Sequence, residues 1–149
     1  MGVLSDIKNS VINIGNNLVN DVKKFANKNL LEGIMAALAL TANANGIIKS
    51  EEKKKIFGFI QRDESLKVYE TQEVLKIFEK YIKNFEFDLD IGKAEAFKAI
   101  YKLKDNKEAA KVLIQVCIAV GKADGNFDEN ERKVVNEICE ALELSILVK

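Results

Sequence analysis

The residues of this sequence best suited to chemistry are the acids of one short loop. The stretch GKADGNFDENE (121–131) gathers four acidic residues around a glycine. They are Asp124, Asp128, Glu129 and Glu131. Alternating Asp and Asn side chains offer the oxygen ligands that Ca²⁺ and Mg²⁺ prefer. An EF-hand loop beginning at Asp124 needs glycine sixth and glutamate twelfth, where the sequence has Glu129 and Val135, so the loop is not an EF-hand.

The same loop also fits a turn between two helices. Gly125 is suited to end one helix, Asp128 to cap the next, and Glu131 to complete a capping box. Each cap stabilises a helix by about 1 kcal/mol, so these residues need no ligand to explain them. Capping does not explain the further charge of Asp124 and Glu129, because crowded carboxylates repel one another unless water or a cation screens them. A divalent cation, Ca²⁺ or Mg²⁺, is therefore the candidate cofactor.

A second acidic stretch, FEFDLDIGKAEA (85–96), offers further candidates. Its acids are Glu86, Asp88, Asp90 and Glu95. In the simplest interpretation Asp88 or Asp90 caps the following helix, and the alternating Phe85, Phe87, Leu89 and Ile91 point inward. In the alternative interpretation these carboxylates join Asp124 and Asp128 in one acidic patch.

The composition argues against several classes of function. The chain has no histidine, so a zinc site or a histidine-based catalytic triad is not expected. Twenty-three basic residues balance twenty-three acidic ones, so nucleic acid is not an expected partner. No phosphate loop, dinucleotide fingerprint or nucleophile elbow is present, and we expect neither catalysis nor a small-molecule substrate. Cys117 and Cys139 fit buried core thiols.

The elements that position these loops are predicted to be helices. The chain of 149 residues has no proline and only eight glycines, which favours a single all-α domain. Apolar periodicity predicts helices over 3–25, 29–45, 50–61, 71–85, 97–105 and 106–123, and a last one from 128 onward. We expect Asn29 and Ser50 to be N-caps.

The N-terminal helix is amphipathic but rich in asparagine, so it needs a surface on which to pack. That surface is its own bundle, another protein or a membrane interface. Neither a signal peptide nor an apolar run of about 18 residues is present, which predicts a cytosolic protein or one peripheral to a membrane from the cytosolic side.

The acidic loop has a nearly neutral counterpart. The stretch TANANGIIKSEE (41–52) precedes a helix in the same way. At a constant offset Gly46 aligns with Gly125 and Glu52 with Glu131, while Asn45 stands opposite Asp124. We interpret the two helix pairs as an internal duplication.

Three motifs together resemble the TerB family of bacterial tellurite-resistance proteins: the duplicated helix-loop-helix, FEFDLDIGKAEA and IAVGKADGNFDENERKVVNEIC. The resemblance covers the chain from the N-terminal helix almost to its last residue. It implies a compact bundle of about seven helices in two pseudo-symmetric halves, with an amphipathic helix (1–28) on or near a TerB-like domain (29–149). It also implies a non-enzymatic stress-response protein of the cytosol and inner membrane. The implied partners are a TerC-like membrane protein and TerD-like calcium-binding proteins.

The resemblance further implies a divalent-cation site on an acidic face. The corresponding residues of this sequence are Glu52, Glu86, Asp88, Asp90, Glu95, Asp124, Asp128, Glu129 and Glu131. Asn45 replaces an expected aspartate and brings no charge, so we expect a cation at the second loop and not at the first. We do not expect the cysteines to bind or reduce tellurite. The alternative is a generic helical scaffold without a metal site, whose N-terminal helix binds a membrane surface or a partner helix.

Overall fold

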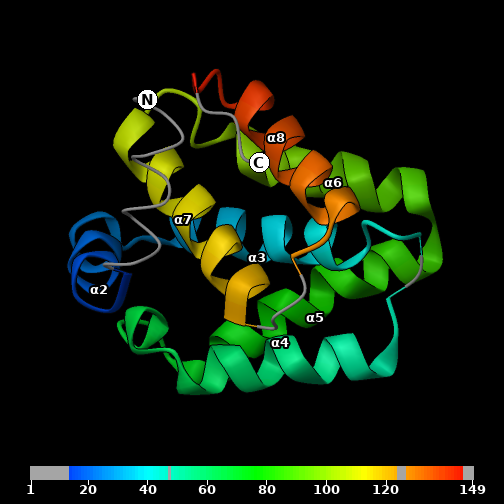
Figure 1. Ribbon diagram of the computed structural model, residues 1–149, viewed down its shortest axis with the longest axis horizontal. Helices are drawn as coiled ribbons and strands as arrows, with labels where there is room; N and C mark the ends of the chain where they lie inside the picture. The colour runs from blue at the N-terminus through cyan, green and yellow to red at the C-terminus, as the bar shows by residue number, and fades with distance from the viewer. Residues whose placement is uncertain (1–13, 47, 124–126, 146–149) are drawn as a thin grey trace.

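Figure 1 shows an all-helical fold in the computed structural model, which describes residues 14–46, 48–123 and 127–145, and of residues 14–17 only the backbone. Within these ranges the chain forms seven α-helices, one 3-10 helix and no strand. They are α2 (Ile14–Phe25), α3 (Lys28–Ala42), α4 (Ser50–Arg62), the 3-10 helix η1 (Glu64–Leu66), α5 (Thr71–Phe87), α6 (Leu89–Tyr101), α7 (Lys107–Ala123) and α8 (Glu129–Ala141). The predicted all-α fold is therefore confirmed, whereas the pseudo-symmetry of its halves stays a prediction.

Helix α3 is central because its sequence is apolar on almost every side. Every residue from Leu30 to Thr41 is buried except Glu32. Its alanines let neighbouring backbones approach closely, and α3 contacts α5, α6, α7 and α8. Figure 1 shows it crossing the middle of the fold behind α7. The central helix ends at the neutral loop, so the position of that loop is fixed by the core.

The described part of the N-terminal helix packs on the chain's own bundle. Helix α2 contacts η1 and α7. Its apolar face buries Leu18 and Val22, which are 3% and 0% exposed. Residues 1–13, where the predicted helix was to begin, lie outside the described residues.

Local capping explains where most helices begin. Asp128 caps α8 by accepting a hydrogen bond from the Glu131 amide at 2.8 Å, and the predicted capping box is present. Asp88 caps α6 in the same way, accepting from the Ile91 amide at 3.0 Å. The prediction of Asn29 as a cap was wrong, because Asn27 accepts from the Leu30 amide at 2.8 Å. Ser50 is the first residue of α4, and its N-cap is Lys49.

The prediction that residues 85–91 alternate inward was also wrong. Phe85 is buried, but Phe87, Leu89 and Ile91 are 80%, 43% and 45% exposed. The reason is that this stretch is helical on both sides of Asp88, so a period of 3.6 residues replaces the period of two found in strands. At the corner between the helices the Phe85 ring covers Gly92, where an added Cβ would lie 2.6 Å from Phe85 Cδ1. This corner leaves apolar side chains on the surface.

Candidate binding site at the junction of the two loops

The neutral loop of the first helix pair and the acidic loop of the second meet in space. Asn45 Nδ2 donates a hydrogen bond to Asp128 Oδ2 at 3.3 Å. Asn130 Nδ2 in turn donates to Asn45 Oδ1. Asn45 therefore links the end of α3 to the start of α8, and we call the contact of these three residues the loop junction.

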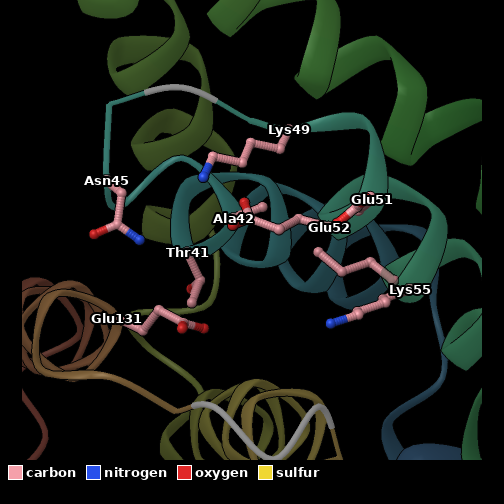
Figure 2. Close-up of a pocket in the computed structure, with 9 residues that line it drawn as sticks. Thr41, Ala42, Asn45, Lys49, Glu51, Glu52, Lys55 and Glu131 are labelled. Carbon is pink, nitrogen blue, oxygen red and sulfur yellow. The ribbon is translucent and has the colours of Figure 1, made fainter.

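A small pocket opens beside the loop junction. It has a volume of about 170 Å³ and lies between the end of α3, the first turns of α4 and the start of α8. Figure 2 shows Glu131 approaching it from α8, opposite Glu52 and Lys55 of α4. Lys49, Glu51 and Asn45 complete its polar wall. The aligned glutamates of the two helix pairs thus face one space, which we call the junction pocket.

Hydrogen bonds hold the acids at the start of α8 in fixed positions. The pKa of Asp128 lies below its usual value, chiefly because its carboxylate accepts a hydrogen bond from the Glu131 backbone and also one from the Asn45 amide. The Glu131 side chain accepts a hydrogen bond from the Asp128 amide at 3.4 Å. Glu129 Oε1 lies 3.8 Å from Lys133 Nζ on the exposed side of the helix. Asp128 is therefore an ionised acceptor at neutral pH.

The junction pocket has some of the oxygen ligands that a metal ion needs, but not a complete set. Across residues 14–46, 48–123 and 127–145 no group of three or more Asp, Glu or Cys side chains is spaced to hold a metal ion. Lys49 and Lys55 border the same pocket as Glu52 and Glu131. Asp124 lies outside the described residues. The described residues thus form a polar pocket of mixed charge. It supplies some oxygen ligands but does not complete the coordination shell of a metal ion.

The second acidic stretch is not joined to this pocket by the described contacts. Asp88 serves as the cap of α6, and Glu95 acts on Tyr81 of α5, whose pKa it helps to raise. Glu86 and Asp90 are exposed. None of these four residues has a described hydrogen bond or ion pair to α8. Their membership of one acidic face stays a prediction.

Comparison with known proteins decides the family. The family model described as "Tellurite resistance protein TerB" matches residues 31–146. A relative named "Tellurium resistance protein TerB", from Alcaligenes sp, is 38% identical over 118 residues, which are 79% of this chain and 97% of the relative. The chain belongs to the TerB family. No solved structure matches it. The resemblance drawn from the sequence motifs is confirmed.

The match to TerB begins at residue 31, within α3, and spans both loops and every later helix to α8. None of the described helices of this TerB-family chain is long and apolar enough to cross a membrane. Its two cysteines are buried and free, and burial raises the pKa of Cys117 to about 12 and that of Cys139 to about 11. Because the thiolate is the reactive form of cysteine, we expect both thiols to be unreactive in this environment.

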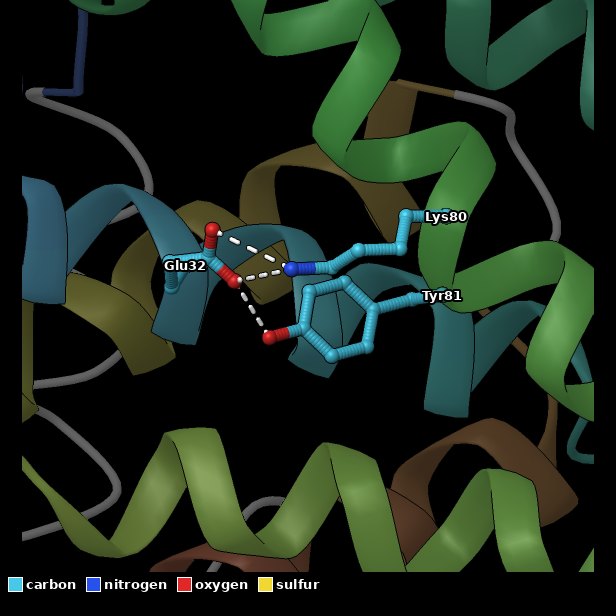
Figure 3. Close-up of polar contacts among 3 residues, drawn as sticks. All are labelled: Glu32, Lys80 and Tyr81. Carbon is cyan, nitrogen blue, oxygen red and sulfur yellow. Dashed lines mark hydrogen bonds and ion pairs between the residues drawn. The ribbon is translucent and has the colours of Figure 1, made fainter.

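Sequence reasoning missed one polar cluster in this TerB-family fold. Glu32, on otherwise buried α3, accepts hydrogen bonds from the Tyr81 hydroxyl and from Lys80 Nζ at 3.0 Å (Figure 3). Burial raises the pKa of Glu32, but the bonds from Tyr81 and Lys80 outweigh that effect and the net pKa is lowered. Burial and the bond to Glu32 raise the pKa of Tyr81. The cluster fixes α5 to α3, and the one signal in the sequence was a lone acid in an apolar helix.

Proposed function

We propose that this TerB-family chain contributes to tellurite resistance as a non-catalytic, cytoplasmic adaptor. The observation that carries the proposal is the loop junction, where Asn45 of the first helix pair contacts Asp128 of the second at 3.3 Å. A polar pocket between the ends of α3, α4 and α8 suits binding where hydrogen bonds already hold its groups in place. Its volume of about 170 Å³ suits an ion or one side chain better than an organic substrate.

We further propose that the acidic loop binds Ca²⁺ or Mg²⁺ weakly. Asp128, Glu129 and Glu131 supply carboxylates, and Asn45 and Glu52 add oxygen atoms from the other loop. Hard cations prefer such ligands, and water commonly completes their shell. Because Lys49 and Lys55 stand nearby and three described carboxylates do not converge, we expect a dissociation constant of about 10⁻⁴ to 10⁻³ M, as in weak calcium modules.

A titration of the ¹⁵N-labelled chain with Ca²⁺, Mg²⁺ and Zn²⁺ tests the cation. We expect saturable amide shifts centred on residues 128–131 and on Asn45, and a weaker response to Zn²⁺. Asp128→Asn removes one charge but keeps a good N-cap, since Asn and Asp cap helices equally well. Asp88→Asn is the matched control, because Asp88 caps α6 in the same way. No saturable shift at millimolar metal, or an equal loss of affinity in both variants, would contradict a cation at the acidic loop.

The TerB resemblance also leads us to propose a TerC-like membrane protein and TerD-like calcium-binding proteins as partners at the inner face of the membrane. Co-purification of each with this chain, with and without Ca²⁺, is the direct measurement. A membrane role for the N-terminus is tested by deleting residues 1–13 only, because Leu18 and Val22 belong to the core. Unchanged liposome binding after that deletion would remove the membrane option of the scaffold alternative and leave its partner-helix option.

A further inference from the structure

A groove between α6 and α8 leaves apolar side chains in solvent. Phe97 and Tyr101 of α6 and Ala141 of α8 form its floor, and its volume is about 790 Å³. The two rings lie 5.9 Å apart at an interplanar angle of 35°, so the aromatic surface is already assembled. Figure 1 shows α8 crossing α6, and the two helices are in contact. We call this feature the α6–α8 groove.

The apolar surface extends from the groove toward the start of α6. Leu89 precedes Phe97 by eight residues, so both lie along one side of the helix. Leu89 is 43% exposed, Tyr101 52% and Phe87, at the corner before α6, 80%. Isolated apolar side chains on a surface are normal, but several of them near one groove are typical of an interaction site.

The described lining of the groove carries two carboxylates and one lysine. Glu137 and Glu140 line the groove, and Lys93 is the one cation among its described lining residues. Asp90 stands one turn before Ala94 on the same face of α6. None of the described ion pairs uses Glu137, Glu140 or Asp90. A ligand of positive charge therefore finds carboxylates that have no cationic partner among the described side chains.

We propose that the α6–α8 groove binds an amphipathic helix of a partner protein, with an apolar stripe on the Phe97–Tyr101 floor and flanking Lys or Arg residues against Glu137 and Glu140. Helix-in-groove recognition combines an apolar stripe with such flanking charges. A second copy of this chain fits less well, because each copy offers one lining lysine, Lys93, to the two glutamates of the other. An anionic membrane fits less well for the same electrostatic reason. The inference rests on the proposed adaptor role and adds the chemistry of the partner.

A labelled synthetic peptide of about 18 residues, leucine on one helical face and lysine on the other, is the probe. Its controls are the same peptide with glutamate for lysine and a shuffled peptide of identical composition. With the full chain we expect saturable fluorescence anisotropy for the first peptide only, and amide shifts confined to residues 89–101 and 137–141. Tyr101→Glu and the double variant Glu137→Lys/Glu140→Lys should each weaken binding by about tenfold or more, since central aromatic and charged contacts dominate such interfaces.

Val68→Glu is the matched control, because Val68 is 42% exposed and follows η1, which packs against α2. It should leave the affinity unchanged, and thermal melting shows that each variant is folded. The inference is overturned by equal effects of Val68→Glu and Tyr101→Glu, by shifts outside the groove, or by absence of binding at about 1 mM peptide. It is also overturned if Tyr101→Glu abolishes a dimer in sedimentation equilibrium, or if vesicles of anionic phospholipid compete with the peptide through the same residues.

The cation titration separates this inference from the proposed function. Tyr101→Glu should leave the Ca²⁺ shifts of residues 128–131 unchanged, because the groove and the junction pocket share no lining residue. If the parent chain shows the cation shifts but does not bind the peptide, the groove alone is rejected. Peptide binding without cation shifts would reject the cation and keep the groove.

Discussion

Gly92→Ala tests the corner between α5 and α6 that carries the exposed Phe87. The new Cβ would lie 2.6 Å from Phe85 Cδ1 and 2.8 Å from the Phe85 Cα, which cannot move unless α5 shifts. Overpacking costs about 1–3 kcal/mol, and contact with backbone places this site near the upper limit. Alanine recovers about 1 kcal/mol of helix propensity. The net loss in the free energy of unfolding is therefore about 2 kcal/mol, or about 4–8 °C in the melting temperature of a chain of this size.

Gly58→Ala in α4 is the matched control. There the nearest atom to the new Cβ is the Arg62 Nη1, at 3.2 Å, and the end of an arginine side chain moves easily. The helix propensity gain should remain, raising the melting temperature by about 2–4 °C. Circular dichroism melts and urea denaturation of both variants measure the difference. If Gly92→Ala is as stable as the parent chain, or if both variants shift alike, close packing at this corner is not what requires glycine.

Three further outcomes follow from the described contacts. Tyr81→Phe removes the hydroxyl that donates to Glu32 and should cost about 1.5–3 kcal/mol in urea denaturation, as expected for a bond to a charged acceptor. Because the pKa of Glu32 is lower in the folded chain, its stabilising effect is complete above its unfolded pKa of 4.5 and is lost as the pH falls through the folded pKa. Glu32→Gln should therefore flatten the acid limb of a plot of unfolding free energy against pH. Buried Cys117 and Cys139 should react with a thiol reagent only in denaturant, and fast reaction of the native chain would contradict their burial.

Features that depend on near neighbours in sequence were predictable. The capping box of Asp128 and Glu131 follows from a spacing of three residues, and the structure contains it. The buried face of α3 follows from its run of apolar and small residues. The same reasoning failed at residues 85–91, because an alternating pattern was assumed where two helices meet at Asp88.

Features that depend on tertiary packing were not predictable from the sequence. The bond between Asn45 and Asp128 joins residues that are distant in the chain, and no local pattern encodes the relative placement of α3 and α8. The alignment of Asn45 with Asp124 indicated that the loops are related, but not that they are in contact. The junction pocket, with Lys49 and Lys55 beside the glutamates, likewise exists only because the first turns of α4 and α8 lie close together in the fold.

The neutral side chain at position 45 has a consequence for how the two halves of the chain depend on each other. Asn45 donates a hydrogen bond to Asp128, so the junction closes without any bound ion. In Asn45→Asp two carboxylates would face each other, with a repulsion of about 1 kcal/mol in water and about 4 kcal/mol at an effective dielectric of 20 for a separation of 4 Å. That variant should be less stable in a chelating buffer and regain stability with added Ca²⁺. One amide thus makes the assembly of the two halves independent of calcium, and a single substitution should make it calcium-dependent.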